Sequence, residues 1–426
     1  MLTLLIGSGG REHALAWRLA QDKGASVVSA PGSPALGRLG EIRPIALDDT
    51  EGLVALARDL RPDLVLVGPE LPLVLGLPDR LRDLGLPVFG PSKAAARIEG
   101  SKVFAKDFMI RHNLPTASYA VFYDAKEAKG YLRDSSYPVV LKADGLAAGK
   151  GVIVCGNNAA AMAALDALMG EDHGKSVIVE EYLAGEEISF FAITDGENII
   201  TLPAAQDHKT VNDGDRGPNT GGMGAYSPPP VATRTLVKLV EEGILLPAVE
   251  GLRVEGAPFV GLLYAGLMIT LNGPKLLEFN ARFGDPETQA LMPLLKGDFG
   301  ETLLAAATGK LKGKTMEWSG DSSVCVVMSS EGYPGPYRQG DPITGIDKAN
   351  ARDQVQVFEA GVGVRDGIPI TKGGRVLGVT ATGKTLRDAI DRAYLAVSDI
   401  SFEGAHYRKD IGEKAFRKTP FHPDEA

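Results

Sequence analysis

Residues 277–289 read LEFNARFGDPETQ and complete a predicted β-hairpin. The preceding residues 259–276, FVGLLYAGLMITLNGPKL, predict a buried strand, a turn at Asn272-Gly273 and a return strand. Side chains alternate along a strand, so the return strand should separate apolar from polar residues. On this basis we expect Leu277, Phe279 and Ala281 on one face and Glu278, Asn280 and Arg282 on the other.

Glu278 and Asn280 form a candidate metal site on this hairpin. A carboxylate and an amide oxygen on one strand face are hard ligands, and Mg²⁺ takes a few such oxygens and completes its shell with water and phosphates. The same pattern also fits an amphipathic edge hairpin whose polar face is solvated. The choice between these two interpretations depends on the remaining motifs of the chain.

The composition is typical of a soluble globular protein with several domains. At 426 residues the chain exceeds one ordinary hydrophobic core, and we expect roughly two to four domains. The formal net charge of −9 argues against non-specific binding of nucleic acid. Cys155 and Cys325 lie in apolar runs and are interpreted as core thiols of a reducing compartment. No apolar run reaches membrane-spanning length and a strand pattern directly follows Met1, so we expect a cytoplasmic protein without membrane association.

Residues 1 to about 100 alternate strand and helix patterns, which predicts an open, doubly wound parallel sheet. Ligands of such sheets bind at the carboxyl ends of the strands. Three loops follow predicted strand ends: GSGGREH, APGSPA and GPELPL.

The first of these loops departs from the dinucleotide-binding fingerprint. Glu12 stands where the third glycine is expected, and no acid ends the second strand, so a nicotinamide dinucleotide is disfavoured. The remaining glycine turn and Arg11, at a helix N-terminus, would suit a single phosphate. A plain strand–helix turn with an exposed arginine is the alternative.

Residues 138–155, PVVLKADGLAAGKGVIVC, place a glycine-rich loop between two strands. The glycine spacing fails the Walker A pattern, and Gly151 replaces the residue that would hold Mg²⁺. We interpret the loop as a flap whose amides close over phosphates, with Lys142 neutralising charge below it. A flexible surface hairpin with solvated lysines has the same composition.

Two further segments carry polar groups that suit ligand contact. Residues 176–188, SVIVEEYLAGEEI, place acids after a buried strand, where they would form either an adenine- and ribose-binding linker or exposed linker acids. Residues 206–230 lack periodicity and are either a substrate-contacting loop or disordered. The candidates for substrate contact in this loop are Asp207, Lys209, Asn219, Gly221 and Gly222.

The remaining segments complete the expected domain plan. An amphipathic helix is predicted over Thr233–Leu252, and a helix with a break at Lys296–Asp298 is predicted over Glu287–Thr308. From Ser322 onward the chain is β-rich and carries one helix, Leu386–Val397. We therefore place domains at residues 1–100, 101–320 and 321–426, with a lid subdomain at about 116–188.

Taken together, these motifs resemble the glycinamide ribonucleotide synthetase (phosphoribosylamine–glycine ligase) family of the ATP-grasp superfamily. The resemblance covers nearly the whole chain and is carried most specifically by RFGDPETQ and NTGGMGAYSP. It extends through GSGGREHA, GSK, VLKADGLAAGKGV, VEEYLAGEEIS, QDHK, SSEGYPGPY and HYRKDIG. It implies an α/β multidomain fold with an N-terminal open parallel sheet, a central ATP-grasp α+β fold with a small lid, and a small C-terminal β-rich domain with one helix.

The resemblance also implies an activity and a set of site residues. The activity is ATP-dependent ligation of glycine to 5-phosphoribosylamine through glycyl phosphate, in de novo purine biosynthesis. ATP would contact Lys102, Lys142, Gly145, Gly149, Lys150, Gly151, Glu180, Glu181, Leu183 and Glu187, and Mg²⁺ or Mn²⁺ would bind Glu278 and Asn280. Gly9, Gly10 and Arg11 would hold the 5-phosphate, and Lys209, Asn219, Gly221 and Gly222 would contact substrate. Catalytic roles are implied for Lys142, Arg282, Asp207, Asp285 and Glu287, with Asp207 and Arg282 orienting glycine and with Asp285 and Glu287 either on the amine side or supporting the residues that contact substrate.

The sequence leaves two alternatives open: another ATP-grasp ligase or carboxylase, and a catalytically silent nucleotide-binding protein. A third, an NAD-dependent dehydrogenase, is disfavoured. The expected partners are small molecules (glycine, 5-phosphoribosylamine and ATP), with no nucleic acid and no membrane, and we expect a monomer.

Overall fold

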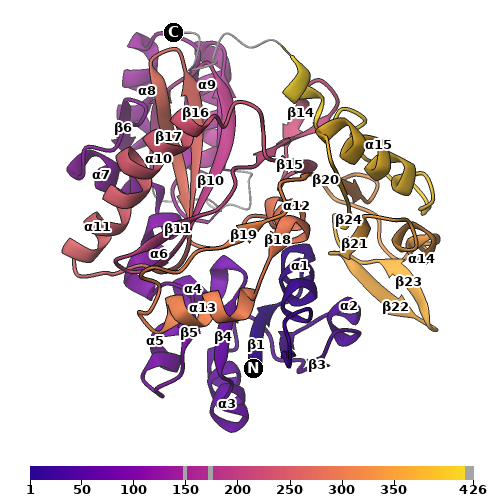
Figure 1. The fold of residues 1–426 in the computed structure, drawn as a ribbon. Coiled ribbons are helices and arrows are strands. Elements are labelled where there is room, and N and C mark those ends of the chain that lie inside the picture. The colour runs from indigo at the N-terminus through magenta and orange to yellow at the C-terminus, as the bar shows by residue number, and fades with distance from the viewer. Residues whose placement is uncertain (147–150, 171–175, 418–426) are drawn as a thin grey trace.

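The computed structural model describes residues 1–146, 151–170 and 176–417 (Figure 1). They form an N-terminal α/β region, a central antiparallel region with a smaller lid sheet, and a C-terminal β-rich region. This confirms the predicted mixed α/β, multidomain class. Within the described residues, no helix is long and apolar enough to cross a membrane.

The N-terminal region is a parallel sheet in the order β3-β2-β1-β4-β5, with helices between the strands. Its elements are β1 Leu2–Gly7, α1 Gly10–Leu19, β2 Ser26–Pro31, α2 Pro34–Gly37, β3 Glu41–Ile42, α3 Thr50–Leu60, β4 Leu64–Val67, α4 Glu70–Leu75, α5 Leu77–Arg82, β5 Val88–Phe89 and α6 Lys93–Gly100. β1 is the point at which the strand order switches, because the chain adds β2 and β3 on one side of β1 and β4 and β5 on the other. The loops that follow β1 and β4 therefore meet at one edge, which is where ligands of doubly wound sheets bind.

The lid is a four-stranded antiparallel sheet in the order β6-β9-β7-β8, with two helices packed together beside it. Its elements are β6 Tyr119–Phe122, α8 Ala125–Asp134, β7 Val139–Ala143, β8 Val152–Cys155, α9 Asn158–Leu168 and β9 Val177–Glu181. It follows α7 Lys102–Arg111, which begins where the Ser101 hydroxyl accepts a hydrogen bond from the Phe104 amide. The lid has its own apolar core, so its sheet holds Lys142 on a separately packed unit.

The central region is a second antiparallel sheet, in the order β11-β10-β16-β17. Its elements are β10 Glu186–Asp195, β11 Ile199–Thr201, α10 Arg234–Val240, the π-helical turn Glu241–Leu245, α11 Leu246–Val254, β16 Val260–Thr270, β17 Gly273–Asn280, α12 Glu287–Leu291, the 3-10 turn Met292–Leu294, β18 Leu295–Lys296 and α13 Phe299–Ala307. The predicted helix over Thr233–Leu252 is thus interrupted by a π-helical turn, and the predicted break before Phe299 is confirmed.

The predicted hairpin is present, but two details of the prediction are wrong. Thr270 pairs with Gly273, so the turn residues are Leu271 and Asn272. The pairing register also shifts, because Gly266 pairs with Glu278 whereas Leu267 pairs with Leu276. Leu277 is the extra residue of this bulge, and it lines the cavity described below instead of joining the core.

The C-terminal region is built around a five-stranded sheet in the order β12-β15-β20-β24-β21, with α15 packed on β20 and β24. Its elements are β19 Glu317–Trp318, β20 Ser322–Ser329, α14 Ile346–Asn350, β21 Val355–Glu359, β22 Val362–Arg365, β23 Ile368–Thr371, β24 Arg375–Gly383, α15 Leu386–Val397 and the 3-10 turn Glu413–Phe416. The expectation of one helix is corrected by the short helix α14.

The segment 206–230 is ordered and supplies two strands of this C-terminal sheet. It contains β12 Gln206–Asp207, β13 Thr210–Asn212, β14 Arg216–Asn219 and β15 Gly224–Ser227. β15 pairs with β20, far along the chain, and β13 pairs with β14 in a separate hairpin. These strands are only two to four residues long, so local periodicity does not reveal them.

Candidate active site

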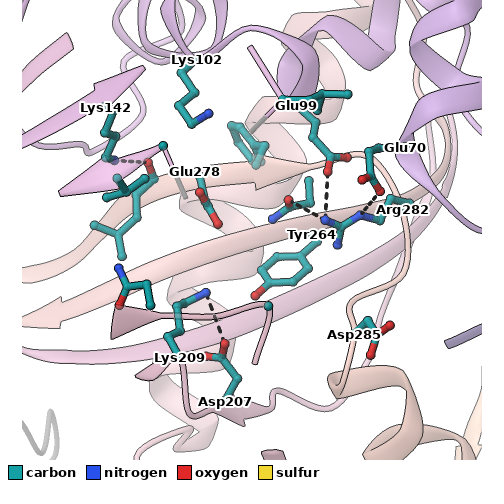
Figure 2. Close-up of a pocket in the computed structure, with 18 of the residues that line it drawn as sticks. Glu70, Glu99, Lys102, Lys142, Asp207, Lys209, Tyr264, Glu278, Arg282 and Asp285 are labelled. Carbon is teal, nitrogen blue, oxygen red and sulfur yellow. Dashed lines mark hydrogen bonds and ion pairs between the residues drawn. The ribbon is translucent and has the colours of Figure 1, made fainter. Parts of the chain in front are cut away.

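Most of the residues singled out from the sequence converge on one cavity of about 470 Å³ (Figure 2). β17 forms its floor, and β7, the start of α7 and the segment after β12 form its sides. α1 and β24 contribute Arg11 and Arg375, so all regions of the chain meet there. A cavity of this size and polarity is suited to a small-molecule ligand.

Lysines surround the candidate metal ligand Glu278. Lys102 donates to the carbonyl of Gly145 at 2.7 Å, and Lys142 donates to the carbonyl of Leu277 at 3.2 Å. Burial alone would raise the pKa of Glu278, but Lys209, Lys142 and Lys102 hold it below its ordinary value. Glu278 is therefore an ionised carboxylate with three lysine ammonium groups nearby.

A second lysine pair holds Glu180 at the base of the lid. Glu180 Oε2 lies 3.1 Å from the ammonium of Lys106 and 3.0 Å from that of Lys142. Burial, only partly offset by Glu180, lowers the pKa of Lys106 to about 8. Glu180 Oε1 is buried without a hydrogen-bond partner among the described residues. That oxygen is free to accept a hydrogen bond from a bound ligand.

Arg282 is held between two acids from the N-terminal half of the chain. Its Nη2 lies 3.0 Å from Glu99 Oε1, and its Nε lies 3.5 Å from Glu70 Oε2 (Figure 2). Nη2 also donates to Asn280 Oδ1 at 3.2 Å. Burial raises the pKa of Glu99, although Arg282 opposes this shift. Arg282 therefore orients the second candidate metal ligand, Asn280.

Asp285 is held by the C-terminal region. Arg375 Nη2 lies 3.3 Å from Asp285 Oδ2, and Arg375 Nη1 donates to the carbonyls of Gly221 at 2.5 Å and Asp285 at 2.7 Å. The Gly221 amide donates to the Tyr333 hydroxyl at 2.9 Å. Burial would raise the pKa of Asp285, but Arg375 and then Arg11 hold it below its ordinary value.

The two remaining acids that line the cavity, Asp207 and Glu287, have different partners. Lys209 lies 3.1 Å from Glu187 Oε1 and 3.3 Å from Asp207 Oδ2. Burial would lower the pKa of Lys209, but these two carboxylates raise it well above its ordinary value. Glu287, in contrast, accepts from the Tyr264 hydroxyl at 2.8 Å and from the Ser189 hydroxyl at 3.4 Å.

The glycine loop after β1 is occupied by a side chain of the protein itself. The Gly9 amide donates to Glu12 Oε2 at 2.7 Å, and Arg11 Nε lies 2.5 Å from Glu12 Oε1. Gly10 packs closely against Gln289 and Ala360. Arg11 alone of the three predicted phosphate-binding residues lines the cavity, where it also donates to the carbonyl of Phe283 at 3.1 Å.

The predicted site residues that line the cavity are Arg11, Lys102, Lys142, Gly145, Gly151, Glu180, Asp207, Lys209, Asn219, Gly221, Glu278, Asn280, Arg282, Asp285 and Glu287. Those not among its lining residues are Gly9, Gly10, Glu181, Leu183, Glu187 and Gly222. Glu181 is exposed and its side chain accepts from the Ser118 amide at 3.0 Å. Gly149 and Lys150 lie outside the described residues.

Sequence reasoning missed several residues of the cavity wall: Glu70, Glu99, Lys106, Tyr264, Tyr333, Tyr337 and Arg375. Glu70 stands in GPELPL, one of the three predicted strand-end loops at which ligands of such sheets bind. Glu99 and Lys106 flank the GSK motif, and Tyr333 belongs to SSEGYPGPY, so these motifs held a usable signal. Arg375 lies in no such motif, and only its contacts reveal it.

His208, between Asp207 and Lys209, yields a prediction about pH and stability. It is fully buried, and neither ring nitrogen has a hydrogen-bond partner among the described residues. Burial, reinforced by Lys414 and Arg408, lowers the pKa of His208 to about 3. In the unfolded chain histidine takes up a proton near pH 6.5, so between about pH 3 and pH 6.5 the unfolded state binds more protons than the folded state. The free energy of unfolding should therefore fall as the pH drops below about 6.5. We expect His208→Leu to lose less free energy of unfolding between pH 7 and pH 5 than the unsubstituted chain does, as measured by urea unfolding. An equal loss in both proteins would show that His208 does not cause this pH dependence.

The lid sheet and the central sheet, which meet at a cavity lined by lysines and acids, define an ATP-grasp enzyme. Comparison with known proteins agrees: residues 1–99, 100–288 and 323–414 match the N domain, the ATP-grasp (A) domain and the C domain of phosphoribosylglycinamide synthetase. The chain therefore belongs to the phosphoribosylglycinamide synthetase family, as its motifs predict.

Individual relatives match over nearly the full length of the chain. Phosphoribosylamine–glycine ligase of Rhizobium meliloti (strain 1021) is 50% identical over 419 residues, covering 97% of this chain and 99% of the relative. The crystal structure of phosphoribosylamine–glycine ligase from Thermotoga maritima has a TM-score of 0.85 and 35% identity, covering 96% of this chain and 100% of that one. The biotin carboxylase domain of Hydrogenobacter thermophilus 2-oxoglutarate carboxylase shares the fold, with a TM-score of 0.73 at 17% identity over 95% of this chain and 91% of that one.

Proposed function

We propose that this chain ligates glycine to 5-phosphoribosylamine with ATP, giving glycinamide ribonucleotide, ADP and phosphate, in de novo purine biosynthesis. The observation that carries this proposal is the match of all three family domains along the chain. The cavity supports it, because it joins residues of all three domains around a set of lysines and acids.

The chemistry of the reaction accounts for this set of charges. A carboxylate is a poor electrophile, so glycine must first be activated as glycyl phosphate by phosphoryl transfer from ATP. Phosphoryl transfer depends mainly on positioning and neutralisation of charge. Lys102 and Lys142 are placed to neutralise the transferred phosphate, beside Gly145 and Gly151 of the flap.

The lid side of the cavity fits the adenine of ATP. The buried Glu180 Oε1, which has no hydrogen-bond partner among the described residues, would accept from an adenine amino group. Ile98, Met109 and Phe279 line the same cavity and offer the apolar contacts that a flat base needs. The predicted roles of Glu181, Leu183 and Glu187 in binding adenine and ribose remain part of the proposal.

Glu278 and Asn280 fit a divalent cation. Glu278 is partly buried beside the lysines without a direct ion pair among the described residues, and Asn280 Oδ1 keeps acceptor capacity besides its bond to Arg282. Mg²⁺ or Mn²⁺ held there would neutralise phosphate oxygens during transfer. Arg282 keeps Asn280 oriented.

The opposite end of the cavity is assigned to glycine and the amine substrate. Asp207 and Arg282 would orient the amino and carboxylate ends of glycine, and Asp285 and Glu287 would either face the amine substrate or support the residues that contact it. Lys209, Asn219 and Gly221 complete that wall. Arg11 would hold the 5-phosphate, because it is the member of the glycine loop that lines the cavity.

The experiment that tests the activity is ADP release with ATP and glycine, with and without ribose 5-phosphate plus ammonia as the source of the amine. We expect full turnover only when both glycine and the amine source are present. A parallel assay with bicarbonate in place of glycine separates the carboxylase alternative. ADP release that depends on neither glycine nor the amine would refute the proposal.

Arg11→Ala should raise the KM for 5-phosphoribosylamine by about tenfold or more and leave the KM for ATP unchanged, because a charge-assisted hydrogen bond contributes about 1.5–3 kcal/mol. The matched control is Arg61→Ala, at an exposed helix end that does not line the cavity. Initial rates at varied amine and varied ATP provide both constants. A raised KM for ATP with an unchanged KM for the amine would place Arg11 in the nucleotide site instead.

A further inference from the structure

The amide-forming step requires a proton acceptor. When the amine of 5-phosphoribosylamine attacks glycyl phosphate, its nitrogen forms a bond to the carbonyl carbon and the carbon–oxygen bond to phosphate breaks. The electron pair leaves with the phosphate, and the nitrogen must lose a proton. A carboxylate on the cavity wall is suited to accept it if that carboxylate is not already committed to a cation.

The acids that line the cavity differ in their partners. Glu278 faces the lysines of the phosphate site, and Asp285 is paired with Arg375. The others with a cationic partner are Glu70 and Glu99 on Arg282, Glu180 on Lys106 and Lys142, and Asp207 on Lys209. Among the described lining acids, Glu287 is the one whose carboxylate accepts hydrogen bonds from hydroxyl groups alone.

Glu287 is held by hydroxyls from two neighbouring strands of the central sheet. The Tyr264 hydroxyl of β16 donates to Glu287 Oε1 at 2.8 Å and lies 2.7 Å from the Ser189 hydroxyl of β10, which itself lies 3.4 Å from Oε1. Glu287 is buried at the start of α12 and lines the cavity. Figure 2 places the Tyr264 ring between Arg282 and Lys209, on the side of the cavity assigned to glycine and the amine.

We propose that Glu287 is the general base that takes the proton from the attacking amine, with Tyr264 and Ser189 fixing its carboxylate. This inference rests on the proposed function, because it assigns a role in the second half of that reaction. The carboxylate accepts the proton as the carbon–nitrogen bond forms, and it passes the proton to solvent after the products leave.

The surroundings of Glu287 favour a stronger base than an exposed glutamate. Burial, followed by the nearby Asp207, raises its pKa, and Lys209 and the Tyr264 hydroxyl oppose this shift. Arg282, Arg375 and Cys325 also lie close enough to interact with it. Asp285, whose pKa is held below its ordinary value, is correspondingly a weaker base.

The test separates activation of glycine from attack by the amine. Hydroxylamine is a reactive nucleophile that needs less help from a base and traps glycyl phosphate as glycine hydroxamate. We expect Glu287→Gln to lower ligation of 5-phosphoribosylamine by about 100-fold or more, the effect of losing a general base. Hydroxylamine-dependent formation of hydroxamate and ADP should stay within about threefold of the unsubstituted enzyme, because activation of glycine does not use this base.

A second variant guards against a purely structural effect. Tyr264→Phe removes a hydrogen-bond donor that lowers the pKa of Glu287. The ligation rate of this variant, compared with that of the unsubstituted enzyme at each pH, should therefore begin to fall at a higher pH on acidification. Glu301→Gln, an exposed glutamate on α13, is the matched control and should leave both rates unchanged.

The outcomes are distinguishable. Equal loss of ligation and hydroxamate formation in Glu287→Gln, or unimpaired ligation, would overturn the assignment of the base. Failure of the unsubstituted enzyme to form glycine hydroxamate with ATP would overturn the proposed function instead.

Discussion

Replacement of Glu278 by glutamine should abolish metal-dependent turnover, lowering kcat/KM by about 1,000-fold or more, because an amide cannot replace an ionised ligand beside transferred phosphate. Glu278 is partly buried near Lys102, Lys142 and Lys209, so its replacement also removes one of the negative charges that face these cations. ADP release with glycine and the amine source, measured over a range of Mg²⁺ and Mn²⁺ concentrations, gives the effect.

The control for this substitution is Glu317→Gln, at an exposed position on β19. It changes the net charge equally and should leave the metal dependence intact. If Glu278→Gln retains the metal dependence of the unsubstituted enzyme, the assignment of Glu278 as a metal ligand is wrong.

Replacement of Arg282 by methionine should cause the largest loss of stability among these substitutions. It removes the cation that lies between Glu70 and the buried Glu99. Because the side chains of Arg282 and Glu70 are 18% and 35% exposed, the cost should lie below that of breaking a fully buried ion pair, which is about 3–5 kcal/mol. It also removes the donor that orients Asn280, so activity should fall in the protein that remains folded. Urea unfolding at neutral pH measures the first effect, and ADP release measures the second.

A double substitution tests the cause of this instability. Glu99→Gln added to Arg282→Met removes the buried charge that lost its partner, so it should recover part of the free energy of unfolding. Recovery of stability without recovery of activity is the expected pattern, because Asn280 remains without its donor. Unfolding of Arg282→Met at the same urea concentration as the unsubstituted chain would show that the ion pairs do not stabilise the fold.

The order of strands and helices follows closely from the sequence in the N-terminal region. Its strands are short apolar runs between amphipathic helices, and both patterns are local. The hairpin over residues 260–280 was predictable for the same reason. The bulge at Leu277 was not, because register depends on the partner strand β16, and a single inserted residue changes the face on which each following side chain lies.

The segment 206–230 shows where local patterns end. Its strand β15 pairs with β20, about a hundred residues later, and β12 pairs with β15 in turn, so strands of only a few residues carry no periodic signal of their own. Its role as a wall of the cavity was nevertheless predictable from the density of polar side chains, because Asp207, Lys209 and Asn219 do line it.

The sequence by itself determined the family, the fold class and most of the charged residues of the cavity, because motifs such as RFGDPETQ keep charged groups at fixed positions along the chain. Only the tertiary structure decided how those charges are paired. Arg282 is held by Glu70 and Glu99, and Asp285 by Arg375, through contacts between residues far apart in sequence. Pairing of this kind depends on which strand ends and loops the packed domains bring together, and it is this pairing that leaves Glu287 with hydroxyl partners and Glu278 facing the lysines.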